Sequence, residues 1–261
     1  MMRSLFIAKT GMDSSQFKLD VISNNLANVN TVGFKRGIAE FQDLYYQTLR
    51  QPGAQLANGT DTPTGLMIGT GAAAVATTRD QTQGTLMSST QPYSLAISGD
   101  GFFAVTMPDG TTAYTRNGEF QRDNNGNMVT PQGYPLNPNI NIPATALSMT
   151  VSNAGVVQYT VAGTSTPSTA GTIQLTSFIN PQGLQSLGQN LYAQTAASGD
   201  PQTGNPGTND LGSIQQGFLE GSNVNVTQEL VDMITAQRSY EMNSKCITTA
   251  DQMLQNLTQI G

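Results

Sequence analysis

The sequence predicts an α+β fold in which long α-helices at the N- and C-terminal ends pair into a coiled-coil-like domain, with a central antiparallel β-rich domain between them. Apolar residues near both ends recur at alternating spacings of three and four, the period of a coiled coil. Short β-branched and aromatic runs separated by turn residues fill the middle. The stretch 51–235 also carries a net charge of −8, whereas residues 1–50 carry +2.

The N-terminal helix is predicted from a heptad seam that is apolar except at Ser15. The pattern stops before Asn28, Asn30 and Gly33, which are residue types that weaken or end helices. The members of this seam are Leu5, Ala8, Met12, Ser15, Leu19, Ile22 and Leu26.

The C-terminal helix is predicted from the same alternation, which continues over 226–257 without Pro or Gly. Asn225 is the expected N-cap, with Gln228 three residues further on. At 1.5 Å per residue such a helix spans roughly 48 Å. Its seam consists of Val226, Glu229, Met233, Ala236, Tyr240, Asn243, Ile247, Ala250, Leu254 and Leu257.

Long helices with narrow apolar stripes are not stable alone and need partners along their length. One interpretation is that each stripe packs on the core of its own chain. Because matching seams stand on either side of a compositionally different middle, we favour the ends pairing with each other and with other copies. The polar seam residues Ser15, Glu229 and Asn243 are then expected to set the register.

The middle, from about residue 69 to 211, is typical of an antiparallel sandwich or barrel. Glycine stands beside Asp or Asn at 99–101, 108–110, 117–118 and 123–126, which indicates hairpin turns. Strands are expected at 93–97, 102–105, 113–116, 119–121, 147–151, 156–161 and 173–178, and loops at 162–171 and 197–210.

The composition excludes most kinds of active site. The chain has no His and one Cys, which excludes a Ser-His-Asp triad, His-ligated metals and thiolate zinc sites. The acids that remain for hydrolytic chemistry are Asp100, Asp109, Glu119 and Asp123. All of them fall at or beside turns, where Asp is expected anyway, so we predict no enzyme and no catalytic, cofactor-binding or metal residues.

The charge and the apolar runs restrict the partners. A net charge of −6 argues against nucleic acid and anionic membranes. No apolar run approaches the roughly 18–20 residues of a membrane helix, so no membrane insertion is predicted. The run 5–8 is also too short for a signal-peptide core, so export would proceed without a cleaved signal of the usual kind.

Four stretches resemble the bacterial flagellar rod and hook family. The stretch 23–36, which includes Asn-Val-Asn-Thr-Val-Gly-Phe-Lys-Arg, resembles the N-terminal signature of that family. The stretch 217–257 resembles its C-terminal helix, and 99–103 and 114–120 resemble its shared β core. Together these stretches recur in the family's order along most of the chain.

The resemblance implies a structural subunit of a helical tube, with paired terminal helices lining the inside and β domains forming the outer wall. It implies self-assembly, transmission of torque across the periplasm and export through the flagellar apparatus. The implied neighbours are proximal rod proteins, the hook protein, and the ring proteins of the peptidoglycan layer and outer membrane.

Within the family, 41–55 and 65–71 resemble the distal-rod branch, whereas hook members typically carry larger middle domains. The segment 55–64 departs most from the expected pattern. Two alternatives stay open: a hook or proximal rod subunit of the same family, and, in a different class, a secreted β-domain adhesin. An adhesin accounts for the middle of the chain but not for the two matching seams.

The expected organisation has three parts. Residues 1–31 and 226–261 form the helical inner-tube domain, 32–74 and 213–225 connect it, and 75–212 form the β-rich outer domain. Within the connection, 41–71 is expected to add contacts between subunits, although a loop packed within its own subunit is the alternative. The residues expected to mediate assembly are Leu5, Met12, Leu19, Ile22, Leu26, Tyr45, Tyr46, Leu49, Val226, Met233, Tyr240, Ile247, Leu254 and Leu257.

Overall fold

The computed structural model describes residues 2–53, 64–163, 166–208 and 211–260. It has the predicted α+β content: an N-terminal helix, antiparallel strands and a C-terminal helix. Contacts divide the chain into two compact units. Unit 1 consists of 1–26, 37–78 and 225–261, and unit 2 consists of 27–36 and 79–224. The three-part division expected from the sequence stays a prediction.

Both predicted helices are confirmed, as α1 (Met2–Ala27) and α2 (Val226–Ile260). The predicted N-cap of α2 is also confirmed, because Asn225 Oδ1 accepts hydrogen bonds from the backbone N–H groups of Thr227 (3.0 Å) and Gln228 (3.3 Å). These bonds satisfy two of the donors that the first turn of a helix leaves unpaired.

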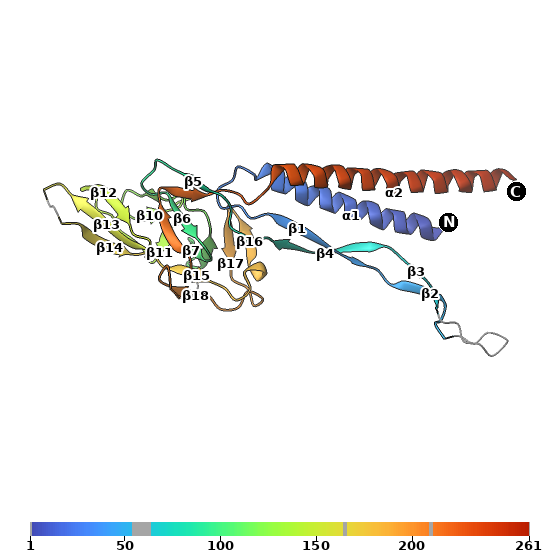
Figure 1. Cartoon of the computed structure of the whole chain (residues 1–261), viewed down its shortest axis with the longest axis horizontal. Helices are drawn as coiled ribbons and strands as arrows, with labels where there is room; N and C mark the ends of the chain where they lie inside the picture. Colours follow the sequence, from blue (N-terminus) through green and yellow to red (C-terminus); the bar gives the residue numbers. More distant parts are fainter. Residues whose placement is uncertain (1, 54–63, 164–165, 209–210, 261) are drawn as a thin grey trace. The chain divides into compact units, whose positions relative to one another are not determined.

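Within unit 1, α1 and α2 lie side by side and run in opposite directions (Figure 1). Near the end of α1, Asn25 donates a hydrogen bond to Glu229, near the start of α2, at 3.2 Å. Near the other end of the pair, Gly11 lies against Asn243, where an added Cβ would stand 2.7 Å from Nδ2. The two contacts fix the same antiparallel register, because the residue numbers rise in one helix by as much as they fall in the other.

Unit 1 also contains two ribbons of two strands each. β1 (Gly37–Asp43) pairs with β4 (Ala72–Arg79), and β2 (Tyr46–Arg50) pairs antiparallel with β3 (Leu66–Gly69). Phe41 of β1 meets Phe17 of α1 edge to face, with 6.4 Å between the ring centroids. Every residue of β2 is exposed. Two-stranded ribbons are marginally stable alone, so β2–β3 depends on further contacts.

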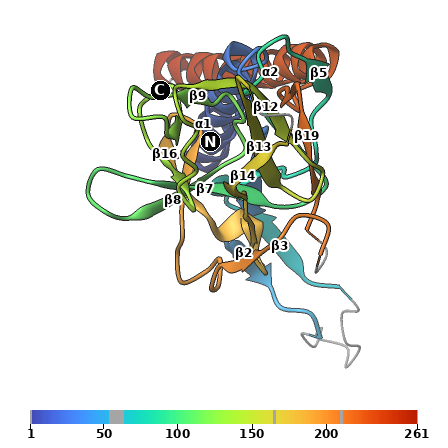
Figure 2. The same ribbon diagram turned by 90° about the vertical axis from the view of Figure 1, so that its left-hand side faces the viewer.

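Unit 2 contains the predicted antiparallel β structure (Figure 2). Among its described residues, a seven-stranded sheet follows the order β16-β17-β8-β7-β15-β18, and β11 pairs with β7. The strands of this sheet are β7 (Phe102–Thr106), β8 (Thr112–Thr115), β11 (Leu136–Asn137), β15 (Leu175–Ser177), β16 (Gln185–Gly188), β17 (Leu191–Ala193) and β18 (Gln202–Gly204).

Smaller sheets and a short helix complete unit 2. The three-stranded sheet consists of β12 (Ala146–Val151), β13 (Val156–Val161) and β14 (Ser168–Thr172). The two-stranded pairs are β5 (Leu86–Ser88) with β20 (Phe218–Glu220), β6 (Leu95–Ser98) with β19 (Ser213–Gln216), and β9 (Gln121–Arg122) with β10 (Met128–Val129). A 3₁₀ helix, η1, covers Pro181–Gly183.

The core of unit 2 follows from strand alternation, because neighbouring residues of a strand point to opposite faces. In β7, Phe103 enters the main core and meets Phe120 edge to face at 5.2 Å, whereas Phe102 joins a second cluster with Tyr114 and Phe178. The main core also contains Leu95, Ile97, Val105, Met128, Leu136, Ile140, Ile142, Val157, Ile173, Leu175 and Ile214.

Some predicted hairpins and strands are confirmed. The turn at 108–110 joins β7 to β8, and Gly110 N donates to Met107 O at 2.9 Å. The turn at 123–126 joins β9 to β10. The strands expected at 147–151 and 156–161 are β12 and β13.

Other local predictions are wrong. The turn at 99–101 does not form a hairpin, because β6 pairs with the distant β19, and the turn at 117–118 does not either, because β8 pairs with β17. The segments expected as loops at 162–171 and 197–210 contribute to β14 and β18. In each case a strand distant in sequence supplies the partner, so tertiary context overrides the local composition.

Candidate assembly surfaces and a buried ion cluster

The predicted seam of α1 is partly covered within unit 1. Ile22 is buried. The half-buried members are Leu5, Met12, Leu19 and Leu26. Three alanines of the two seams, Ala8, Ala236 and Ala250, are buried as well. The large seam residues of α1 other than Ile22 therefore stay partly accessible.

The seam of α2 is covered less evenly. Met233, Ile247 and Leu254 are half-buried, whereas Val226 and Tyr240 are exposed. The side chain of Leu257 lies outside the described residues. Beyond the seam, α2 exposes further apolar side chains that the heptad pattern did not single out: Leu230, Val231, Ile234, Met242 and Met253. Exposed apolar groups at this density are typical of a surface that another chain covers.

Two of the three polar seam residues, Glu229 and Asn243, lie against the opposite helix. Glu229 is fully buried and accepts a hydrogen bond from Asn25. The carboxamide of Asn25 also pairs with the peptide group of Gly37, since Nδ2 donates to Gly37 O and Gly37 N donates to Oδ1, both at 2.8 Å. Ser15 instead bonds back to the Gly11 carbonyl of its own helix at 2.8 Å. Buried polar contacts of this kind favour one register over others.

The distinctive stretch 41–71 presents its predicted anchors to solvent. Tyr45 is 93% exposed, and Tyr46 and Leu49 are exposed by more than half. On the pairing strand, Leu66 and Met67 are also exposed. Residues 54–63 lie outside the described residues. The described part of this stretch therefore carries an apolar surface that its own unit leaves uncovered.

The sequence-based interpretation missed a buried ion cluster in unit 2, formed by Lys35, Arg116 and Glu220. Lys35 Nζ lies 2.7 Å from Glu220 Oε1, and both side chains are 1% exposed. Arg116 Nε lies 3.4 Å from Glu220 Oε2, and the Arg116 side chain is 3% exposed. The three residues come from the loop after α1, the end of β8 and the end of β20, so the cluster joins three distant parts of the chain.

Hydrogen bonds to backbone carbonyls occupy further donor groups of the two cations in the cluster. Lys35 Nζ also donates to the carbonyls of Thr82 (2.8 Å) and Gln81 (3.4 Å). Arg116 donates to the carbonyls of Gly101 (2.8 Å) and Gly99 (2.9 Å). Buried charges are tolerated only when they are paired and hydrogen-bonded in this way.

Burial shifts the titration of these groups. It lowers the pKa of Lys35, the positive charge of Arg116 lowers this pKa further, and the attraction of Glu220 opposes both effects. Burial also lowers the pKa of the Arg116 guanidinium. In the same unit, burial raises the pKa of the Tyr114 and Tyr192 hydroxyls.

A second set of hydrogen bonds holds the segment before α2, residues 220–223, beside the ion cluster. Asn223 Oδ1 accepts from Arg36 N at 2.7 Å, and Asn223 Nδ2 donates to the carbonyls of Asp80 (2.9 Å) and Thr82 (3.1 Å). Gly33 N donates to Glu220 O at 2.8 Å. Gly33 has a φ of +71°, and a Cβ there would stand 2.7 Å from the backbone nitrogen of Asn117, so only glycine fits this approach.

The cluster lies where three of the four resembling stretches meet. Lys35 belongs to 23–36, Arg116 to 114–120 and Glu220 to 217–257. The available signal was the presence of charged residues inside these motifs in a chain with only 11% charged residues. Nothing local to each residue showed that the three would contact one another.

The described residues were compared with two further kinds of site, a metal site and a membrane-spanning helix. They contain no group of three or more His, Cys, Asp or Glu side chains placed to hold a metal ion. No described helix is both long and apolar enough to cross a membrane.

Three family models match successive parts of the chain. A flagella basal body rod protein model matches residues 5–35, the flagellar hook protein FlgE/F/G D1 domain matches 96–159, and the flagellar basal body rod FlgEFG protein C-terminal model matches 215–260. The first includes Lys35, the second Arg116 and the third Glu220.

Relatives that match the chain over nearly its full length carry names from the same family. The flagellar basal-body rod protein FlgG of Buchnera aphidicola subsp. Schizaphis graminum is 50% identical over 260 residues, which is 100% of both chains. FlgG of Caulobacter vibrioides is 46% identical over 99% of both chains, and FlgG of Bacillus subtilis is 41% identical over 100% of this chain and 99% of its own. With relatives of this identity matched from end to end, the chain belongs to the flagellar basal-body rod family.

Proposed function

We propose that this chain is the structural subunit of the distal rod of the bacterial flagellum. It polymerises head to tail into a rigid helical tube that transmits torque across the periplasm to the hook and encloses the export channel. The observation that carries the proposal is the end-to-end similarity to FlgG proteins at 41–50% identity. Head-to-tail contacts that do not close on themselves generate such a filament.

The terminal helices supply the inner part of this assembly. We assign α1 and α2 to a coiled-coil-like pair whose uncovered apolar side chains pack against other copies. The partly exposed seam residues and the exposed Leu230, Ile234 and Met242 support this role. Buried in a polymer, such side chains each contribute about 1.5–3 kcal/mol, which is enough in sum to drive assembly.

The stretch 41–71 is assigned to contacts that stiffen the tube. Tyr45, Tyr46 and Leu49 support this assignment, because exposed aromatic and aliphatic groups on a marginal two-stranded ribbon gain stability when another subunit covers them. Deleting 46–63 is expected to lower the bending stiffness of reconstituted filaments. A triple change of these three residues to Ser is the finer test, with exposed Leu187→Ser as its control. Unchanged stiffness in the deletion and the triple variant would remove this assignment.

The partners follow from the place of the rod. We propose contacts with copies of the same chain, proximal rod proteins, the hook protein, and the ring proteins of the peptidoglycan layer and outer membrane. The chain reaches this location, the basal body across the periplasm, through the flagellar export apparatus. No cofactor or enzymatic activity is part of the proposal.

Immunogold labelling of isolated hook–basal bodies tests the proposal, with an antibody raised against 85–210 and bodies from a deletion strain as the control. Label confined to the shaft between the rings and the hook is the expected result. Label along the hook, or on the lower part of the rod, would keep the family and replace the distal assignment. Intact basal bodies without any label would refute a rod function.

A further inference from the structure

α2 carries a second series of residues at alternating spacings of four and three, beside the seam that faces α1. Each member stands one position before a seam residue, so the series lies about 100° around the helix from that seam. The spacing is that of a coiled-coil contact, and no member is charged. The members of this second series are Thr235, Ser239, Met242, Cys246, Thr249 and Met253.

Unit 1 covers the seam of α2 in part and leaves the second series open. The seam residues Ala236 and Ala250 are buried. In the second series Ser239 is half-buried, and the other members are exposed. The second series is therefore a face of α2 that its own unit leaves accessible.

The two methionines are the large apolar side chains of this face. Met242 is 61% exposed and Met253 53%, whereas Met128 and Met149 are buried in the core of unit 2. Oxidation of a methionine converts its flexible apolar side chain into a polar sulfoxide, and enzymes reverse the change. Because a peroxide must reach the sulfur, Met242 and Met253 are open to this reaction and the two core methionines are protected.

The hydroxyl groups that precede Met242 in the series are already engaged. The Thr235 hydroxyl donates to Val231 O, and the Ser239 hydroxyl donates to Thr235 O, both at 2.9 Å. A sulfoxide on this face therefore gains no hydrogen bond from these two donors when the face is covered. Its polar oxygen then opposes burial, since a buried acceptor without a partner costs free energy.

A terminal helix of a second copy matches this face. The second series keeps step with the seam of α2 from Thr235 to Met253, so a helix with the same period fits it as α1 fits the seam. α1 has that period, and its large seam residues Leu5, Met12 and Leu19 are only half-buried in their own unit. A second copy therefore offers both the spacing and the apolar side chains that this face lacks.

We propose that Met242 and Met253 are sites of reversible sulfoxidation by peroxides, and that the oxidised chain does not polymerise. The thioether sulfur attacks one oxygen of hydrogen peroxide, an S–O bond forms as the O–O bond breaks, and water leaves. The sulfur is oxidised and the peroxide is reduced. This inference rests on the proposed self-assembly, because it requires a second copy to cover this face of α2.

Peptide mapping by mass spectrometry locates the oxidation in the full-length chain. Every sample carries Cys246→Ser, because the exposed thiol also reacts. After limited treatment of the dilute chain with hydrogen peroxide, an added oxygen is expected on Met242 and Met253 and none on Met128 or Met149. In filaments formed before treatment, Met242 and Met253 should react several-fold more slowly. Equal rates in chain and filament would show that no second copy covers this face and would overturn the inference.

The critical concentration for polymerisation measures the consequence. The oxidised chain is expected to need a roughly tenfold higher concentration, and methionine sulfoxide reductases should restore the untreated value. The double variant Met242→Leu with Met253→Leu keeps an apolar face without sulfur, so it should polymerise normally and resist peroxide. Met87→Leu removes another exposed methionine, in unit 2, and is the matched control that should stay sensitive.

The outcomes separate this inference from the proposed function. If peroxide still inhibits the double variant, or if the oxidised chain keeps both its critical concentration and its circular dichroism, the inference is overturned and labelling of the rod by the antibody still stands. If the untreated chain never polymerises and no basal body is labelled, the proposed function is refuted and this inference is refuted with it.

Discussion

Glu220→Gln is expected to destabilise unit 2 strongly, because it removes a carboxylate that contacts two buried cations. Lys35 Nζ lies 2.7 Å and Arg116 Nε 3.4 Å from the Glu220 carboxylate, and all three side chains are at most 3% exposed. Removing one partner of a buried ion pair costs about 3–5 kcal/mol, since the remaining charges stay desolvated without compensation. Domains are stable by only about 5–15 kcal/mol, so the loss is a large fraction of the total.

Urea unfolding of the dilute full-length chain measures this effect. The chain has no Trp, so its fluorescence comes from eight tyrosines, of which Tyr114 and Tyr192 are buried in unit 2. For 150–250 residues, 1 kcal/mol corresponds to about 2–4 °C, so a parallel thermal scan should show Tm lowered by roughly 6–20 °C. Glu119→Gln removes an exposed carboxylate from the same unit and should stay within about 0.5 kcal/mol of wild type.

A second variant separates the charge effect from lost packing. Adding Lys35→Met to Glu220→Gln removes one of the uncompensated cations, so the double variant should recover part of the stability. If Glu220→Gln loses less than about 1 kcal/mol, or if Lys35→Met makes the loss larger by its full single-variant cost, then the cluster does not act as a compensated ion network.

Three further outcomes are expected. The pKa of Lys35 is lowered on folding from 10.5, so the folded chain binds fewer protons than the unfolded chain and the free energy of unfolding should rise with pH up to about 10. Above that, the buried tyrosines reverse the trend, and Lys35→Met should flatten the rise in urea titrations at several pH values. Asn25→Ala should cost about 1–3 kcal/mol in the thermal dissociation of filaments, because it removes the hydrogen bonds of Asn25 to Gly37 and Glu229, whereas a cost near zero would contradict the described bonds. Gly11→Ala and Asn243→Ala should couple by about 0.5–3 kcal/mol in a double-mutant cycle, since an added Cβ meets Asn243 at 2.7 Å; strict additivity would refute the close approach.

The sequence alone determined the two terminal helices, the N-cap at Asn225 and the hairpin turns at 108–110 and 123–126. These features depend on residues that are close along the chain: the apolar period, one capping side chain, and glycine beside Asp or Asn. The family resemblance was also visible in local motifs, which the family models and full-length relatives then matched.

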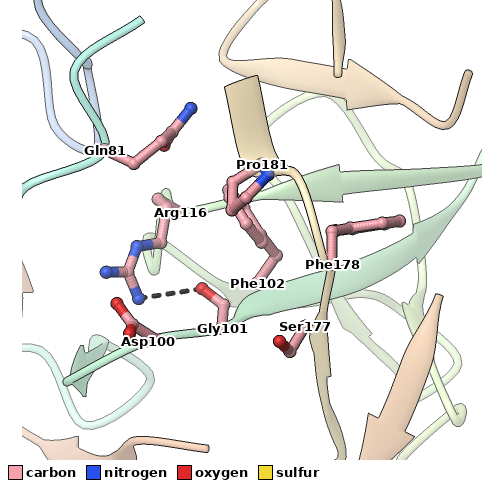
Figure 3. A pocket seen from close by; sticks show the side chains of 8 residues that line it. All are labelled: Gln81, Asp100, Gly101, Phe102, Arg116, Ser177, Phe178 and Pro181. Atoms are coloured by element: carbon pink, nitrogen blue, oxygen red, sulfur yellow. Dashed lines mark hydrogen bonds between the residues drawn. The ribbon is translucent and has the colours of Figure 1, made fainter. Parts of the chain in front are cut away.

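Tertiary structure alone decided which strands pair and which charges meet. The turn at 99–101 has hairpin composition, yet β6 pairs with β19 because the returning C-terminal segment completes its ladder. Lys35 and Glu220 are 185 positions apart, and no pattern around either residue encodes the contact. The same holds for a pocket of unit 2, where Gln81 lies beside residues of β7 and η1 only once the unit has folded (Figure 3).

The two sets of features differ in how far apart along the chain the interacting residues are. A helix period, a cap and a tight turn are satisfied by hydrogen bonds and packing within a few residues, so the sequence specifies them directly. Strand partners and buried ion clusters depend on desolvation and on groups that approach from distant segments. In this chain the local rules identify the two terminal helices, and the folding of unit 2 decides which strands pair and which charges meet.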